Sequence, residues 1–309
     1  MSERPVAVNI AELSPPDWDW VGGKFDDDPF RWVSCSGHPS SPLAKSLESK
    51  IKRPHIGRYR ACWQGVDAAR REHAKVIVTH EPLIAAWTGA LYQVAKLDMP
   101  HLAFAFTFSN LPTGAKREAL RRAYRSVDRF VCFSSIERAR YAEYFDIPLE
   151  KIDMLRWCVA DPGFDPEEAP IEPGPYLCAV GSEGRDYGTL FEAMRRLPKL
   201  KLVVVARPEN LVGLDVPDNV VVHKNIPLSQ VWNIIAHAKL MVLPARDAEV
   251  PCGHGTLLIA MKLDTPSILT ESMAMTDYIT PEETGLVCPP ANPAAMAETI
   301  VRLWDDGKL

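Results

Sequence analysis

The chain of 309 residues is too long for one compact core and has the length of two domains of roughly 150 residues each. Hydrophobic residues make up 47% and charged residues 24%, a balance that excludes a disordered chain, a collagen-like fibre and a coiled coil. No apolar run approaches the roughly 20 residues of a membrane-spanning helix, and residues 1–5 lack the pattern of a secretory signal. Seven cysteines without a C-x-x-C pair argue against a disulfide framework or a zinc site, so we expect a cytoplasmic protein.

The net charge of −5 is divided unevenly along the chain. Residues 1–160 carry 23 basic and 19 acidic side chains, whereas residues 161–309 carry 12 and 21. This asymmetry indicates two halves with different partners. The acidic second half argues against a nucleic acid bound along the whole protein, so we expect no nucleic-acid partner.

The first half alternates between segments with helical spacing and short segments with the character of buried strands. This alternation predicts a parallel sheet covered by helices and a first α/β domain over residues 1–160. An aromatic, acidic stretch rich in proline and glycine, residues 14–23, is predicted to be a long loop. The predicted strands are residues 6–10, 75–80, 101–106 and 129–133, and the predicted helices are residues 63–72, 84–97 and 116–127.

A segment rich in proline separates this pattern from a second one. Residues 161–175 have no periodicity and are predicted to form an interdomain linker. The alternation then restarts and predicts a second α/β domain over residues 176–309. Together the two patterns predict two doubly wound, Rossmann-like units that face a central cleft. The predicted strands are residues 176–180, 201–206, 219–223, 240–244 and 266–270, and the predicted helices are residues 187–196, 229–238, 255–262 and 292–303.

Two strand-to-helix connections of the second half have the composition of phosphate-binding turns. In the first, Gly181 and Gly184 allow a close approach of the backbone to a ligand, and Arg185 is an arginine without an obvious partner. In the second, Gly253 and Gly255 lie at the start of a helix, where free N–H groups and the helix dipole favour an anion. His254 and Thr256 lie in the same segment, in which His254 is either a phosphate donor or a structural residue.

From about residue 75 to residue 305, and most clearly from Tyr176 onward, the sequence resembles the retaining GT-B glycosyltransferases of the family-four type, also called group 1. The two connections above are similar to the donor-phosphate turn and the characteristic helix of that family. Each matching segment is short, and their order and spacing together carry the resemblance. These segments are residues 180–190, 255–262, 266–270, 277–279 and 283–290.

The resemblance implies an enzyme that moves a sugar from a UDP- or GDP-linked donor to a saccharide, lipid or small-molecule acceptor with retention. The donor is expected on the C-terminal domain and the acceptor on the N-terminal domain. Positive side chains and a helix dipole balance the departing diphosphate in this mechanism, so neither a metal nor a cofactor is expected. The expected catalytic residues are Arg185, Glu249 and His80, and the expected donor contacts are Gly181, Ser182, Gly184, Arg246, Gly253, His254, Gly255, Thr256 and Ile259.

Two positions depart from the family pattern, which has two glutamates eight positions apart at the donor sugar and the ribose. Here these positions are Pro251 and Ile259, and isoleucine cannot accept a hydrogen bond from ribose. Glu249, two residues before Pro251, is the candidate replacement for the first carboxylate. A nucleotide-sugar epimerase of the same fold and a non-catalytic nucleotide-sugar-binding relative therefore stay open as alternatives.

Two features of the first half also have alternative interpretations. His80 ends a predicted strand, where it either contacts donor or acceptor or packs as a structural histidine. The segment of residues 116–125 has one strongly basic side. Relatives that glycosylate lipids rest such helices on anionic membranes, so this helix is either a peripheral membrane contact or a solvated face.

Overall fold

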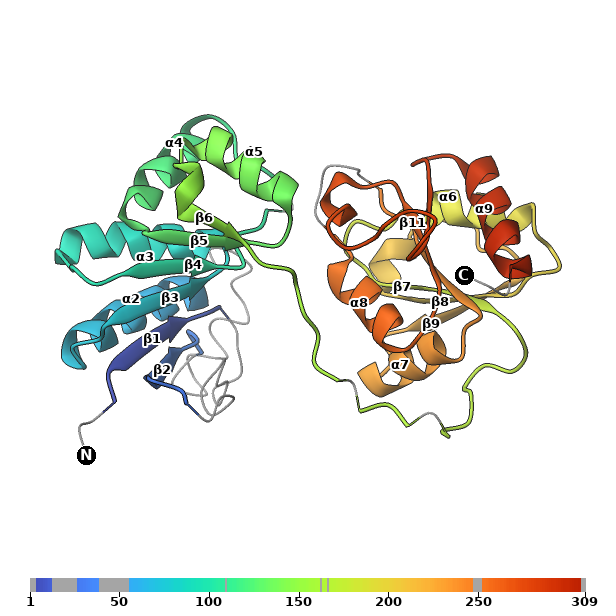
Figure 1. Cartoon of the computed structure of the whole chain (residues 1–309), viewed down its shortest axis with the longest axis horizontal. Helices are drawn as coiled ribbons and strands as arrows, with labels where there is room; N and C mark the ends of the chain where they lie inside the picture. The colour runs from blue at the N-terminus through green and yellow to red at the C-terminus, as the bar shows by residue number, and fades with distance from the viewer. Residues whose placement is uncertain are drawn as a thin grey trace. The chain divides into compact units, whose positions relative to one another are not determined.

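The computed structural model describes residues 4–12, 27–38, 56–108, 110–161, 163–165, 167–246 and 252–306. The chain divides into two compact units, Met1–Leu155 and Arg156–Leu309, each with one six-stranded parallel sheet (Figure 1). This architecture confirms the predicted α/β class with two Rossmann-like units. The predicted loop at residues 14–23 lies outside the described residues. No helix that the structure describes combines the length and the apolar character needed to cross a membrane.

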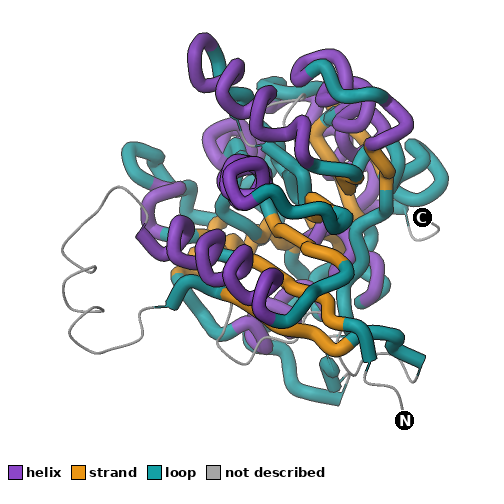
Figure 2. Tube along the Cα trace, turned by 90° about the vertical axis from the view of Figure 1, so that its left-hand side faces the viewer, coloured by secondary structure: helices purple, strands orange, loops and turns teal. Residues whose placement is uncertain are grey.

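The N-terminal unit begins with an apolar strand, because five successive buried residues leave no solvent-facing position in it. The unit contains β1 (Val6–Ile10), β2 (Arg31–Cys35), α2 (Ile56–Arg71), β3 (Val76–His80), α3 (Pro82–Ala95), β4 (His101–Phe104), α4 (Gly114–Ala123), β5 (Arg129–Cys132), α5 (Ser135–Phe145) and β6 (Ile152–Met154). The strand order is β2-β1-β3-β4-β5-β6. Consecutive helices from α2 to α5 contact one another and form a layer against the sheet, which Figure 2 shows as purple coils over orange strands.

Alternate strand positions separate the two faces of this sheet. Val8 pairs with Ile77, and both belong to the core beneath α2 and α3. Asn9 comes one position after Val8, and His80 comes three positions after Ile77. Because side chains alternate along a strand, both point to the opposite face of the sheet. His80 is in register with Phe104 there. The polar residues at the ends of β1 and β3 are therefore separated from the helix layer by the sheet.

The C-terminal unit is doubly wound. It contains β7 (Leu177–Val180), α6 (Tyr187–Arg195), β8 (Leu202–Ala206), β9 (Val220–Lys224), α7 (Leu228–Ala236), β10 (Leu240–Leu243), α8 (His254–Lys262), β11 (Ser267–Thr270), β12 (Leu286–Cys288) and α9 (Pro293–Asp305). The strand order is β12-β11-β10-β7-β8-β9. Side chains of α6 and α9 share one buried cluster and those of α7 and α8 share another, so helices cover both faces of the sheet.

The segment predicted as a linker is part of the second compact unit, which begins at Arg156. The backbone N–H of Ile171 donates to Asn233 Oδ1 at 3.0 Å. Glu172 lies 2.5 Å from the ammonium of Lys201 and 2.7 Å from the ring of His223. These contacts hold residues 167–175 against the C-terminal sheet and its helices.

Candidate functional site

The order of strands in the C-terminal sheet reverses at one place. β7 lies between β8, which follows it in the chain, and β10, which comes three strands later. In open parallel sheets ligands bind outside the carboxyl ends of the strands at such a switch point. The connections that follow β7 and β10 are the two phosphate-binding turns predicted from the sequence. The fold therefore brings both turns to the same edge of the sheet.

The turn after β7 requires its two glycines. Gly181 has φ of +124°, and a Cβ there would lie 2.6 Å from the Arg185 guanidinium. Gly184 has φ of +62°, and a Cβ there would lie 2.7 Å from Cys252 Sγ. Both positive φ values and both contacts exclude a larger side chain without rearrangement. Ser182, between them, accepts a hydrogen bond at its carbonyl from Asn210 Nδ2 at 2.8 Å.

Backbone hydrogen bonds fix the connection after β10 to this turn. Asp186 N–H donates to the Pro244 carbonyl at 2.8 Å, and Arg246 N–H donates to the Gly184 carbonyl at 2.8 Å. The exposed Arg246 side chain also donates to the Arg185 carbonyl, at 3.2 Å. The two predicted turns therefore form one rigid structure, with the Arg246 side chain at its surface.

Arg185 is buried beneath this structure, and only 4% of the residue is exposed. Its guanidinium donates to the carbonyls of Val180 and Glu183, to Cys252 Sγ at 3.1 Å and to Thr256 Oγ1 at 3.2 Å. The prediction of an arginine without a partner is therefore wrong, because the turn folds the side chain back under its own loop. No carboxylate in the described part of the chain contacts this guanidinium, so its charge has no counter-ion there.

Helix α8 begins next to Arg185, which donates a hydrogen bond to Thr256 in the first turn of the helix. Its first residue follows Gly253, which has φ of +102° and provides no side-chain cap. Helix α6, in contrast, is capped by Asp186, which accepts a hydrogen bond from Thr189 N–H at 3.0 Å. The first N–H groups of a helix have no acceptor within the helix and lie at its positive end. A Cβ on Gly255 would meet nothing within 4 Å, so there is open space beside this first turn of the helix.

The other predicted donor contacts have different surroundings. His254 is only 8% exposed, and its ring centre lies 4.6 Å from that of Tyr278 at an interplanar angle of 60°. Ile259 packs against the apolar cluster beneath α7 and α8. Glu249 lies outside the described residues. No group of three or more His, Cys, Asp or Glu side chains suited to a metal ion occurs among the residues that are described.

The N-terminal sheet also reverses its strand order, between β1 and β3, and His80 lies at that point. His80 Nε2 is 2.8 Å from Asn9 Oδ1, and its ring centre is 5.4 Å from that of Phe104. Burial lowers the pKa of His80 to about 4, so the imidazole is neutral at physiological pH. Asn9 Nδ2 is buried and has no hydrogen-bond partner among the described residues. The sequence predicted His80 as a candidate, but nothing in it indicated Asn9.

The residue after His80 has an unusual backbone. Glu81 has φ of +73° and ψ of 150°, a region populated almost only by glycine. It directly precedes Pro82, the first residue of α3, and its N–H donates to the Phe104 carbonyl at 3.0 Å. Partial burial, with a contribution from nearby Glu12, raises the pKa of Glu81. The Glu-Pro pair in the sequence is a signal for a helix boundary, but it does not reveal this strain.

The basic helix α4 is partly neutralised within the protein. Arg117 stacks over the Tyr144 ring, with 4.3 Å between the guanidinium carbon and the ring centre. Arg121 and Arg122 each lie 2.9 Å from the Glu118 carboxylate. Surface ion pairs of this kind contribute little to stability, but they reduce the positive charge that the helix presents.

Comparison with known proteins agrees with the fold. Residues 175–306 match the family Glycosyl transferases group 1. A glycosyltransferase from Rickettsia africae ESF-5 superimposes with a TM-score of 0.69 at 14% identity, covering 97% of this chain and 88% of that one. Anabaena Alr3699/HepE, solved in complex with UDP-glucose, gives 0.67 at 11% identity, with 97% and 90% covered.

Sucrose-phosphate synthase from Thermosynechococcus elongatus gives a TM-score of 0.64 at 17% identity, covering 97% of this chain and 80% of that one. No curated protein sequence matches the chain. The C-terminal unit, with its glycine turns at the switch point, is therefore a domain of the glycosyl transferases group 1 family, and the protein is a glycosyltransferase of the GT-B fold.

Proposed function

We propose that the chain transfers a sugar from a UDP- or GDP-linked donor with retention and without a metal ion. The diphosphate binds at the start of α8, where the first N–H groups have no acceptor within the helix and no side-chain cap. Arg246, at the surface of the joined turns, approaches the diphosphate from the side. The acceptor, a saccharide, a lipid or a small molecule, binds the N-terminal unit.

One observation carries this proposal. Arg185 is a buried cation that has no carboxylate partner among the described residues, and it lies beneath an uncapped helix start. An isolated buried charge is costly unless an opposite charge compensates it. A bound diphosphate supplies that charge, and the helix dipole adds to the same positive potential. Arg185 acts here as a positioning residue, because its own hydrogen bonds are made within the loop.

The same arrangement stabilises the departing group. During transfer the bond between the anomeric carbon and the donor phosphate oxygen breaks, and a bond to an acceptor oxygen forms. Negative charge then develops on the diphosphate, beside N–H groups that are fixed before the reaction begins. This fixed positive potential supplies the charge compensation for which other transferases use a metal. His80, with its neutral imidazole, contributes a hydrogen bond to a sugar or acceptor hydroxyl rather than a positive charge.

The proposal is tested by titration calorimetry with UDP and GDP on the wild type, Gly255→Glu and Gly255→Gln. The glutamate adds a negative charge at the helix start, which favours the helix itself, so we expect an unchanged thermal midpoint. Nucleotide affinity is expected to fall at least 100-fold in Gly255→Glu and much less in Gly255→Gln, which fills similar space without charge. Equal affinity of the wild type and Gly255→Glu would remove the diphosphate from this helix.

A donor-hydrolysis and transfer assay then separates an enzyme from a binding relative. Ile259 leaves the ribose without the carboxylate typical of the family. We therefore expect Ile259→Glu to raise nucleotide affinity and the wild type to turn over slowly but measurably. Tight nucleotide binding without any turnover of a panel of UDP- and GDP-sugars would favour the non-catalytic alternative.

A further inference from the structure

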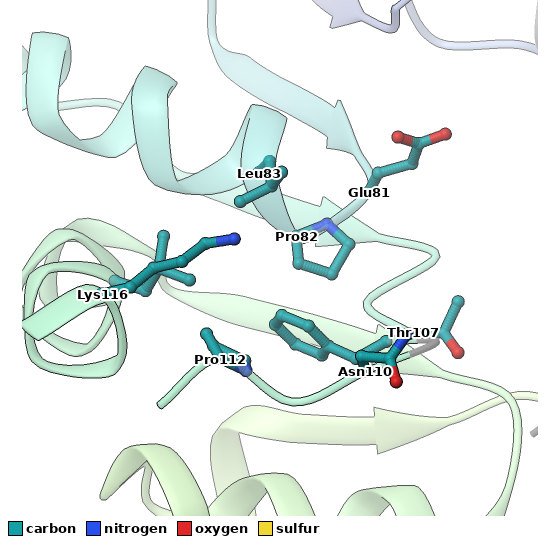
Figure 3. A pocket seen from close by; sticks show the side chains of 9 residues that line it. Glu81, Pro82, Leu83, Thr107, Asn110, Pro112 and Lys116 are labelled. Atoms are coloured by element: carbon teal, nitrogen blue, oxygen red, sulfur yellow. The ribbon is translucent and has the colours of Figure 1, made fainter. Parts of the chain in front are cut away.

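The N-terminal unit contains a pocket of about 460 Å³ between the start of α3 and helix α4 (Figure 3). It lies within one unit and is separate from the nucleotide site proposed above. Much of its wall is apolar, and a few polar groups converge on it, which is the usual composition of a small-molecule site. The lining residues are Glu81, Pro82, Leu83, Thr107, Phe108, Asn110, Pro112, Lys116 and Leu120.

The charged groups of the pocket are arranged asymmetrically. Figure 3 shows the Lys116 ammonium extending from α4 across the pocket toward Leu83 and Pro82. The Glu81 carboxylate points away from Lys116. The pocket therefore presents one cation, with the hydroxyl of Thr107 and the amide of Asn110 as further hydrogen-bonding groups.

Lys116 differs from the arginines that follow it on α4. Arg117 donates to the Tyr144 carbonyl at 2.9 Å and stacks on that ring, and Arg121 and Arg122 pair with Glu118. Within the described ranges Lys116 has no hydrogen bond or ion pair. It is thus a cation on this helix that is available to an external anion.

An apolar surface continues from the mouth of the pocket along α3. This helix, Pro82–Ala95, contains no charged residue. Leu83, Trp87 and Val94 follow one another at helical spacing, and Trp87 is 43% and Val94 83% exposed. Tyr59 of α2 packs edge-on against Trp87, with 4.7 Å between ring centres, and widens this surface.

We propose that this pocket binds an organic oxyanion, a phosphate or carboxylate attached to an apolar group. The oxyanion contacts Lys116, and the apolar group leaves the pocket past Leu83 and lies along Trp87. A point charge on a flexible side chain suits a phosphate or carboxylate, and the uncharged helix face suits a hydrocarbon. If this ligand is the acceptor of the enzyme, the inference rests on the proposed function. The assignment of the pocket as a binding site does not depend on that function.

The first test is calorimetric titration with octyl phosphate below its micelle concentration. We expect Lys116→Ala to bind at least tenfold more weakly than the wild type, and Lys116→Arg to restore most of the affinity. Arg122→Ala is the matched control, because it removes an exposed cation of the same helix that is paired with Glu118. Equal affinities of the wild type and Lys116→Ala, or an equal loss in Arg122→Ala, would overturn the proposal.

The apolar half of the proposal has its own test. Octyl phosphate should bind at least tenfold more tightly than inorganic phosphate, and Trp87→Gln should reduce this difference while leaving the affinity for inorganic phosphate unchanged. If inorganic phosphate binds as tightly as octyl phosphate, the apolar surface has no role. Vesicles of anionic phospholipid then show whether the bound oxyanion belongs to a membrane lipid or to a soluble molecule. Binding of the vesicles that is lost in Lys116→Ala indicates a lipid phosphate, and octyl phosphate binding without vesicle binding indicates a soluble ligand.

The two proposals fail separately. Gly255→Glu should lose nucleotide affinity and keep octyl phosphate affinity, because the two sites lie in different units. Octyl phosphate binding by a wild type that binds no nucleotide would remove the proposed transfer and leave the pocket assignment intact. Nucleotide binding without octyl phosphate binding would remove the pocket assignment and leave the proposed transfer intact.

Discussion

Both sheets contain a point at which the strand order reverses, but different residues lie at that point in the two units. In the C-terminal unit the reversal brings together two glycine-containing connections, a buried Arg185 and the uncapped start of α8. In the N-terminal unit it brings together His80 and Asn9, both almost fully buried, next to a strained Glu81. The first arrangement presents backbone N–H groups that suit an anion. The second presents the neutral side chains of Asn9 and His80. Topology thus selects the place of a site, and local sequence selects its chemistry.

Acidification should affect the N-terminal unit most strongly. Burial lowers the pKa values of His80 and His101 to about 4, whereas the unfolded chain takes up these protons near pH 6.5. Stability from both residues is therefore present above pH 6.5 and is lost as the pH falls toward 4. For each histidine, the free energy of unfolding measured by denaturant titration should be about 2.5 kcal/mol lower at pH 4.5 than at pH 7.

The double variant His80→Gln, His101→Gln is the control for this pH effect. Glutamine keeps a polar side chain and does not titrate, so the difference between pH 7 and pH 4.5 should shrink in the variant. If the wild type and the double variant lose stability equally on acidification, these histidines are not the source.

Two glycines at the start of α8, Gly253 and Gly255, distinguish a residue that the fold requires from one that a ligand would contact. Gly253→Ala places a Cβ 2.9 Å from Leu243 at a φ of +102°, so we expect a loss of about 2 kcal/mol in the free energy of unfolding. Gly255→Ala meets open space inside a helix and should gain roughly 0.5 kcal/mol. Thermal and denaturant unfolding of the two variants measures the difference. Similar stabilities would mean that Gly253 is not held as described.

Removal of the buried cation should weaken the C-terminal site. Arg185→Ala is expected to lower nucleoside diphosphate affinity more than tenfold, or about 1.4 kcal/mol, by removing both its charge and the support of Thr256. Arg195→Ala is a suitable control, because that exposed arginine ends α6 and pairs with Glu192 of the same helix and with Asp215 of a later loop. Calorimetry should find the control unchanged, and unchanged affinity in Arg185→Ala would exclude this residue from the site.

A further small effect is expected at the strained residue of the N-terminal reversal. Glu81→Gly should stabilise the protein by about 1 kcal/mol, because relief of a strain of about 1–3 kcal/mol exceeds the added chain entropy of glycine. Glu81→Ala keeps the unfavourable φ and should bring no such gain. Equal unfolding free energies of the two variants would show that the side chain, and not the backbone, determines stability there.

The strand predicted at residues 201–206 could be recognised because residues 202–206 are apolar without interruption, and the structure buries all five. The strand at residues 6–10 was predicted from apolar residues at alternate positions, and the structure buries all of them, Asn9 included. The edge strand β2 was missed because its residues alternate irregularly between half-buried and exposed. Helix α5 was also missed, although Ser134 and Glu137 form a capping box that marks its start.

The environment of Arg185 could not be predicted, because its partners are determined by tertiary structure. Two of them, Cys252 and Thr256, lie 67 and 71 residues away in the sequence. The other two are backbone carbonyls, which carry no residue identity in a sequence. The sequence could therefore indicate a candidate phosphate-binding turn, but not that its arginine is folded back under the loop.

The segment from Arg156 to residue 175 determines where the chain can be cut. Trp157 N–H donates to the Tyr278 hydroxyl at 2.7 Å, and the Tyr278 ring packs against His254 at the start of α8. A recombinant fragment that starts at Tyr176 would discard this strap together with Glu172, a partner of Lys201. A fragment that starts at Arg156 keeps both of these contacts and follows the boundary of the compact unit, so it is suited to binding and crystallisation trials without the other half.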